Sequence, residues 1–214
     1  MKLKSLIAIA VTGICFSVPA AAETVVSLPR FEGISLQGGG RVILRHGSQQ
    51  KVTIVQGDSD ITRLSVDRQS LKIDACEDRC PAGYRLVLEV VSPDIEAIAV
   101  RGGGTVEAEG RFPGRKALAL SVQGGGAIDT EVVDTQRVAA SVQGGGTIRT
   151  KASSSLAASV NGGGTITYLG DPSIATSIRG GGHVDRARTT SSWLRLDARE
   201  TVASRCLPID AIRV

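Results

Sequence analysis

Hydrophobic and polar positions alternate along most of the chain, and the alternation continues across a repeated run of three glycines. Val138, Ala140 and Val142 share one parity with Ile148, which follows the glycines, and polar or small residues stand between them. A period of two is typical of a β-strand that buries one face. The pattern therefore predicts strands, and it lacks the helical period of an amphipathic helix.

Six segments share the order small or polar, aliphatic, polar, Gly-Gly-Gly, any residue, aliphatic. Their triplets begin at Gly38, Gly102, Gly124, Gly144, Gly162 and Gly180. The later triplets recur with a short period, and the first interval is close to three such periods. This period combined with strand alternation predicts a solenoid of parallel β-coils. Stacking the coils places the aliphatic residues in two columns: Leu36, Val100, Val122, Val142, Val160 and Ile178, and then Val42, Val106, Ile128, Ile148, Ile166 and Val184.

The triplets themselves are typical of sharp turns at which neighbouring backbones come close together. Glycine adopts positive φ without strain and has no Cβ to meet the next coil. A phosphate-binding loop would need a helix start and a following Lys-Ser/Thr, and calcium-binding repeats would need Asp in each turn. Because the triplets have neither, we interpret the glycines as structural.

The N-terminus has the pattern of a secretory signal peptide over residues 1–22. Lys2 and Lys4 precede an apolar stretch, and Ala20-Ala21-Ala22 offers a cleavage site before Glu23. We expect export by the Sec route to the periplasm, the cell surface or the medium, and no transmembrane segment in the mature chain. The alternative is an uncleaved N-terminal anchor.

Residues 23–214 are expected to form a single domain. The coils are most regular over 95–188, and the tail, 189–214, lacks a triplet and is expected to be a last coil or a cap, because solenoid ends need covering. The formal net charge of the chain is +4, and removal of two lysines with the signal peptide lowers it to +2. A charge this small gives no support to nucleic-acid binding.

Cysteine usage agrees with an oxidising compartment. Removal of Cys15 would leave Cys76, Cys80 and Cys206. Cys76 and Cys80, with three residues between them, are expected to form a local disulfide. A zinc site is the weaker alternative, because two thiols with no nearby His do not complete a tetrahedral shell. Three alternatives remain open for Cys206: a free thiol, a disulfide with another chain, or a disulfide in which it displaces Cys76 or Cys80.

Several short motifs resemble the family of the putative auto-transporter adhesin, head GIN domain. They are Phe31-Glu32-Gly33-Ile34, the run from Val52 to Asp58, Leu71-Lys72-Ile73, and the turn from Thr167 to Pro172, together with the glycine turns. The resemblance covers about residues 31–184. It implies an exported right-handed parallel β-helix, and it brings no catalytic residues or cofactors.

The outward positions of the regular coils form the candidate binding surface. Its possible ladder consists of Gln123, Gln143, Asn161, Arg179, Thr147 and Thr165. Such a ladder could bind a repeating glycan or another envelope polymer, or it could simply solvate the sheet. An enzyme is not expected, because the acids of the regular coils form no column and His46 and His183 have no evident partner. The sequence therefore favours a non-catalytic, adhesin-like binding module of the cell envelope, with a periplasmic scaffold as the alternative and a polysaccharide-active enzyme less favoured.

Overall fold

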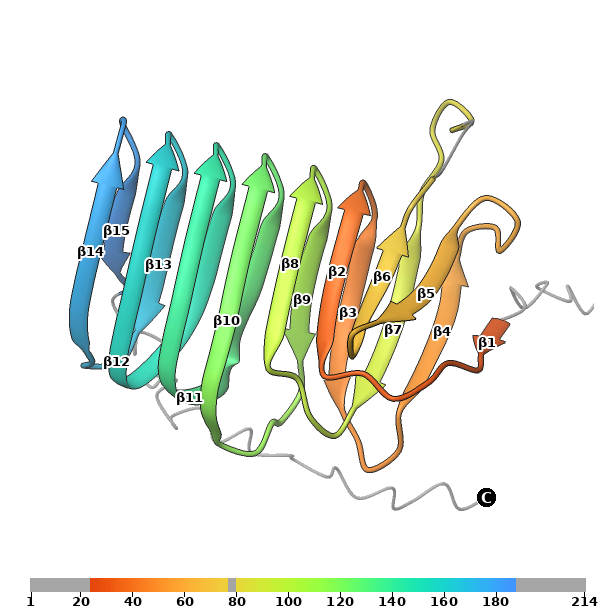
Figure 1. Ribbon diagram of the computed structural model, residues 1–214, viewed down its shortest axis with the longest axis horizontal. Helices are drawn as coiled ribbons and strands as arrows, with labels where there is room; N and C mark the ends of the chain where they lie inside the picture. Colours follow the sequence, from red (N-terminus) through yellow and green to blue (C-terminus); the bar gives the residue numbers. More distant parts are fainter. Residues whose placement is uncertain (1–23, 77–79, 188–214) are drawn as a thin grey trace, which may run out of the picture.

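The computed structural model describes residues 24–76 and 80–187, and within these ranges it contains fifteen strands and no helix. All fifteen strands belong to one mixed sheet, which curls so that most strands stack in two layers (Figure 1). The prediction of an all-β chain is confirmed. The expected signal peptide at 1–22 and the expected cap at 189–214 lie outside the described residues.

The two layers are joined along one edge by the glycine turns. The front layer contains β6 (Ser70–Asp74), β2 (Gly33–Gly38), β8 (Ala97–Gly102), β10 (Arg115–Gly124), the second halves of β11 (Ala127–Gly144) and β12 (Thr147–Gly162), and β14 (Ser173–Arg179). The back layer contains β7 (Val87–Ser92), β3 (Arg41–His46), β9 (Thr105–Glu109), the first parts of β11 and β12, β13 (Thr165–Leu169) and β15 (His183–Arg186). Three further strands, β1 (Thr24–Val26), β4 (Lys51–Gln56) and β5 (Arg63–Asp67), pair antiparallel at the N-terminal end.

Both predicted aliphatic columns are confirmed by the strand register. In the front layer Val122 pairs with Val100 on one side and with Val142 on the other, and in the back layer Ile128 lies between Val106 and Ile148. These side chains point between the layers and are almost fully buried. Branched aliphatic side chains stacked in register fill most of this narrow interior, and the core includes the aromatic residues Phe31 and Tyr168. This explains how a chain with 3% aromatic residues builds a core.

Differences in coil length are absorbed at the corner opposite the glycine edge. Between β11 and β12 the register shifts only from Thr130 to Asp134 and from Thr135 to Arg137, and the pairs before and after these shifts remain aligned. The longer coil that ends at Gly144 therefore stacks on the shorter one that ends at Gly162 without disturbing the columns. The inward side chains keep their partners because a difference of two positions preserves side-chain parity.

The interpretation of the first triplet interval, from Gly38 to Gly102, as three stacked periods is wrong. After β3 the chain leaves the stack through β4 and the β5–β6 hairpin, and β6 and β7 then pair with the outer side of β2 and β3. Arg68 and Gln69 have φ angles of 48° and 62° at the hairpin turn, as in the tight turns that antiparallel strands prefer. The coil of β2 and β3 thus comes first in the sequence, but in the stack it lies inside the coil of β6 and β7.

In the triplets from Gly102 onward, the first and third glycines are required by the stacking, but the middle one is not. Gly144 has a φ of 115°, and a Cβ there would lie 2.7 Å from the carbonyl oxygen of Gly124. At Gly146 a Cβ would lie 2.6 Å from the carbonyl oxygen of Gly126, whereas at Gly145 it would meet nothing within 4 Å. The structural reason predicted for all three glycines therefore holds for two.

The three glycines of one triplet should respond differently to alanine. We expect Gly144→Ala and Gly146→Ala each to lower the free energy of unfolding by about 2–4 kcal/mol, from backbone strain at positive φ, overpacking or both. Gly145→Ala should change it by less than about 0.5 kcal/mol, as other surface substitutions do. Urea unfolding of the three variants checks this, and equal losses at all three positions would contradict it.

Candidate functional site

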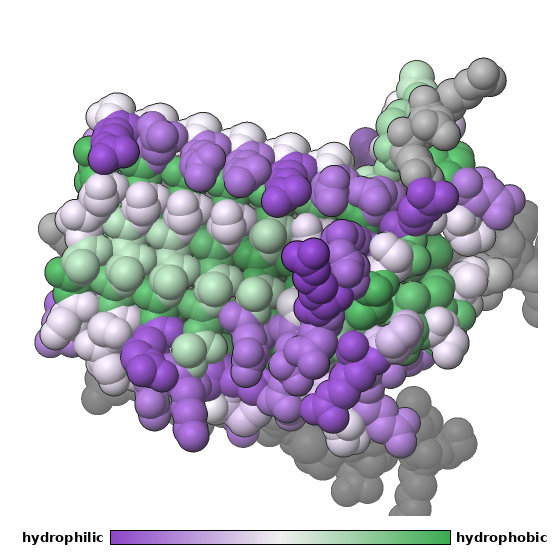
Figure 2. Space-filling model, in the orientation of Figure 1, coloured by the Kyte–Doolittle hydropathy of each residue, from purple (hydrophilic) through white to green (hydrophobic). Residues whose placement is uncertain are grey.

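A groove runs across the front layer, perpendicular to its strands. Its floor is a row of outward alanines in register, Ala119, Ala139, Ala157 and Ala175, one from each of β10, β11, β12 and β14. All four are exposed. Because each side chain ends at Cβ, the surface is low along this row, and Figure 2 shows it as an apolar band between more polar borders. We call this feature the alanine groove.

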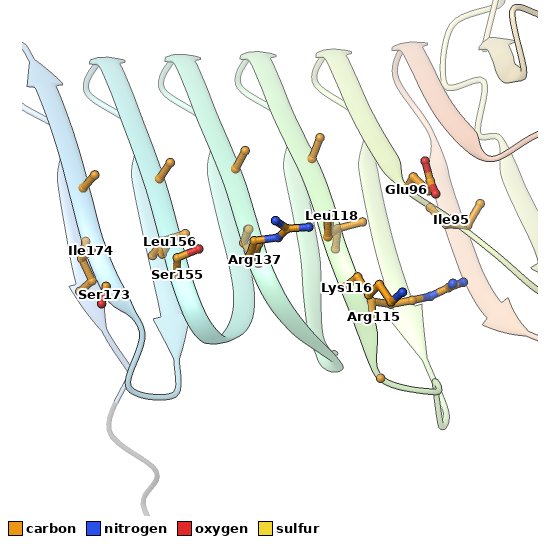
Figure 3. A pocket seen from close by; sticks show the side chains of 17 residues that line it. Ile95, Glu96, Arg115, Lys116, Leu118, Arg137, Ser155, Leu156, Ser173 and Ile174 are labelled. Carbon is orange, nitrogen blue, oxygen red and sulfur yellow. The ribbon is translucent and has the colours of Figure 1, made fainter.

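Longer side chains border the alanine groove on the corner side. The lining of the larger hollow, about 980 Å³, includes Glu96, Arg115, Lys116 and Arg137. A second hollow of about 530 Å³ shares the alanine floor and is bordered by Ser141, Ser159 and Ser177. Figure 3 shows Lys116, Arg115 and Arg137 on β10 and β11, with Ser155 and Ser173 continuing the same border towards the last coil.

The six residues of the predicted ladder lie on two surfaces. Gln123, Gln143, Asn161 and Arg179 are in register in the front layer, on the glycine side of the serine row. Thr147 and Thr165 pair with each other in the back layer, beyond the glycine turns. The structure therefore brings the first four together in one row, beyond the serines that border the alanine groove, and it places the two threonines on the other side of the glycine edge.

The cations of the back layer are paired with acids. Arg45 contacts Glu109 at 2.9 Å and Arg186 contacts Asp171 at 3.2 Å. Arg149 donates from Nε and Nη2 to the two carboxylate oxygens of Glu131, each at 2.9 Å. These hydrogen bonds, and then the charge of Glu131, raise the pKa of Arg149 above its ordinary value. Further pairs join Arg41 to Glu107 and Lys151 to Asp134.

The cations beside the alanine groove are different. Arg101, Lys116, Arg137 and Arg179 are exposed, and none of them has an acidic partner among the residues that the structure describes. Arg115, at the corner, is paired with Asp94, and Glu96 is an exposed acid in the lining. The front surface therefore carries uncompensated positive charge, whereas the positive charges of the back layer are largely neutralised by acids.

Sequence reasoning from the glycine triplets found the Gln row but missed the groove floor and Arg137. The signal was present, because an alanine precedes each of five triplets at the same distance, from Ala97 to Ala175. Alanine occurs in cores and on surfaces alike, so its repeat gains meaning only once the register shows that these positions face outward. The unpaired state of Arg137 depends on contacts that sequence spacing does not reveal.

The remaining candidate chemistry is dispersed. Cys76 and Cys80 form a disulfide with a Cα–Cα distance of 5.6 Å, between β6 and β7 in the chain. His46 lies beside Phe112, with ring centroids 6.1 Å apart, and His183 begins β15. Within residues 24–76 and 80–187, no three His, Cys, Asp or Glu side chains are grouped as metal ligands. The same ranges hold no helix long and apolar enough to cross a membrane.

The chain belongs to the family described as putative auto-transporter adhesin, head GIN domain, whose model matches residues 30–117 and 115–172. The recognition made from the sequence is therefore confirmed. Neither this description nor the names of the structural neighbours below refers to an enzymatic activity. A search of curated proteins gave no match.

Similar solved structures come from several bacteria. A putative adhesin from Bacteroides fragilis is 19% identical, with a TM-score of 0.50 over 78% of this chain and 96% of its own. A putative lipid binding protein from Parabacteroides distasonis is 14% identical, with a TM-score of 0.38 over 78% and 96%. A putative cell adhesion protein from Clostridium sporogenes is 10% identical, with a TM-score of 0.38 over 77% and 97%. At these identities the first of them supports the fold alone.

Proposed function

We propose that this protein is an exported, non-catalytic, adhesin-like binding module of the cell envelope, built as a right-handed parallel β-helix. Its ligand is an extended polymer that carries acidic groups and lies along the alanine groove. The proposal uses no cofactor and no metal. The observation that carries it is the continuous groove across four stacked strands, bordered by cations without acidic partners.

The shape of the groove favours a linear ligand. Successive coils repeat the same outward residue types about every 4.8 Å, so each coil offers a similar alanine floor and a similar polar border. The floor is open at the surface rather than enclosed, unlike the concave pockets that bury most of a small molecule. A chain of repeating units can follow such a surface, with the amides of Gln123, Gln143 and Asn161 on one side.

The charge of the groove favours an acidic ligand. Arg137 and Lys116 stand at one border, and Arg101 and Arg179 end the row of Gln123, Gln143 and Asn161 beyond the serines of the other border. Guanidinium groups bind carboxylates and phosphates through paired hydrogen bonds. Because these side chains are exposed, the attraction is modest and screened by salt. Affinity for an acidic polymer would therefore come from several weak contacts along its length and fall as ionic strength rises.

The alternative is a periplasmic scaffold that binds no polymer. The back layer, with its exposed ion pairs, fits such a role equally well, since paired surface charges keep a sheet soluble without recognising a ligand. The alanine groove and its unpaired cations are what favour a binding module over a scaffold.

Binding should depend on the front layer and not on the back layer. We expect Arg137→Gln to weaken binding to immobilised polygalacturonate about three- to tenfold, the loss of roughly 1 kcal/mol typical of an exposed charge contact. The matched control is Arg149→Gln, which removes the same charge from the back layer and should leave binding unchanged. Surface plasmon resonance at two salt concentrations, with neutral dextran as a reference surface, measures both.

Obstructing the floor should have a larger effect than removing one charge. We expect Ala157→Trp to weaken binding by about tenfold or more, since a lost contact surface worth about 1.4 kcal/mol is a factor of ten. Ala127→Trp places the same side chain on the back layer and should bind like the parent. Equal affinities for all four variants, or equal binding to dextran, would contradict the proposal.

Export is tested separately. Expressed from its full coding sequence in a Gram-negative host, the protein should be recovered from the periplasm or medium with Glu23 as its first residue, because the Ala20–Ala22 site is cleaved. Intact-mass spectrometry and N-terminal sequencing measure this. A cytoplasmic chain that retains Met1 or its neighbours would contradict the export step while leaving the groove experiment valid.

A further inference from the structure

A single unpaired carboxylate stands among the cations of the larger hollow of the alanine groove. Glu96, which directly precedes β8, lines this hollow together with Lys116 and Arg137. Glu96 is exposed, and among the residues that the structure describes no cation forms an ion pair with it. A ligand that carried only acidic groups would be repelled by this carboxylate. The acid therefore needs a reason that the proposed function does not yet supply.

The backbone holds Glu96 at the side of the groove. The Ala119 amide of β10 donates to the Glu96 carbonyl at 2.9 Å, and the Glu96 amide donates to the Glu32 carbonyl at 2.7 Å. Neighbouring segments on both sides thus fix the position of this residue, although it lies just outside β8. Its carboxylate is presented to the hollow from a fixed point of the sheet.

Arg137 faces the same hollow from the other side of β10. It lies in register with Ala117 of β10, so one whole strand separates it from Glu96. Strands two steps apart in a sheet are about 10 Å apart. Figure 3 shows the Arg137 side chain extending from β11 towards Leu118, with Glu96 beyond it. The two charges do not neutralise each other, and both remain open to one ligand.

We propose that the ligand of the alanine groove is an acidic glycan that also carries free amino groups, and that Glu96 binds one of these as an ammonium. This inference rests on the proposed function and deepens it by naming a second charge on the ligand. The N–H groups of Lys116 and Arg137 would donate to carboxylate or phosphate groups of the polymer. The carboxylate oxygens of Glu96 would accept from an ammonium group nearer to β8.

The floor of the groove favours a glycan over a peptide. Extended peptides are often bound by adding a strand to a free sheet edge, but β10, β11 and β12 each pair with a strand on both sides. Their backbone groups are therefore already used. The surface beside the floor instead offers the hydroxyls of Ser141 and Ser159 and, further out, the amide of Gln143. Such groups both donate and accept, as the hydroxyls of a sugar ring require.

A matched pair of polymers isolates the amino groups. Carboxymethyl chitosan carries carboxylates and free amines on one glycan backbone, and N-acetylation of the same sample removes the charge of the amines while keeping the carboxylates. Surface plasmon resonance with the full chain compares the two polymers at about pH 5.5, where a glutamate side chain is ionised and the glucosamine amines are protonated.

Removal of the Glu96 charge should affect the two polymers differently. We expect Glu96→Gln to weaken binding of carboxymethyl chitosan about two- to fivefold, as the loss of one exposed ion pair does. Binding of the N-acetylated polymer should stay the same or become tighter, because a charge that repels its carboxylates is lost. Glu96→Lys should shift both affinities further in the same directions. The control Asp185→Asn, which removes an exposed acid from β15 in the back layer, should change neither.

Two results would overturn the role of Glu96: a change by the same factor for both polymers in Glu96→Gln, or the same behaviour in Asp185→Asn. Tighter binding of a copolymer of glutamate and lysine than of carboxymethyl chitosan would overturn the choice of a glycan.

Arg137→Gln separates this inference from the proposed function. If this variant weakens binding of both polymers while Glu96→Gln does not distinguish them, the groove binds acidic groups and only the inference about the amino groups is wrong. If the parent protein binds neither polymer, or if Arg137→Gln changes neither affinity, the proposed function is wrong and this inference is wrong with it.

Discussion

The close stacking of backbones at the glycine edge is the constraint on which the rest of the fold depends. At each triplet from Gly102 onward, the first and third residues lie so near the preceding coil that no side chain fits. The same approach lets amides pair across coils, as when the Gly145 amide donates to the Gly124 carbonyl at 3.0 Å. Hydrogen bonding is thus maintained around a turn that would otherwise leave backbone groups unsatisfied. The edge fixes one end of each strand that a glycine triplet joins, and from there the register is carried along both layers.

The register makes the interior and the front surface two consequences of one arrangement. Side chains alternate across the sheet. The register that stacks valines in the core columns therefore also stacks alanines, serines and amides in outward rows. Variation in coil length is confined to the opposite corner, between Thr130 and Arg137. The corner is therefore where the chain departs from the repeat, and it is also where Lys116 and Arg137 border the groove.

Much of the fold could be predicted from the sequence, because the repeat shows the same residue type at equivalent positions of several coils. The strands, both core columns and the family could be predicted from parity and triplet spacing. The path from β3 to β8 could not, since the long interval from Gly38 to Gly102 suits three periods as well as it suits a hairpin that folds back to the outer side of β2 and β3. The groove was also missed, because alanine at five successive equivalent positions has no polarity to mark it as outward. Charge compensation was hidden for a different reason: Arg137 and Arg149 look alike in sequence, and only the contacts of Arg149 with Glu131 separate them.

The two ends of the stack differ within the described residues. At the N-terminal end, antiparallel strands cover the outer coil: β4 pairs with β7, β1 pairs with β4, and β5 pairs with β6. These strands interrupt the repeat, and they account for the irregular first third of the sequence. At the other end the repeat continues unchanged up to Arg186, and the hydrophobic columns end at Ile178 and Val184 with no described strand beyond them. Since an uncovered sheet edge is adhesive, the irregular residues of the N-terminal end protect one end of the stack. Sequence that departs from the repeat is where such a fold stops growing.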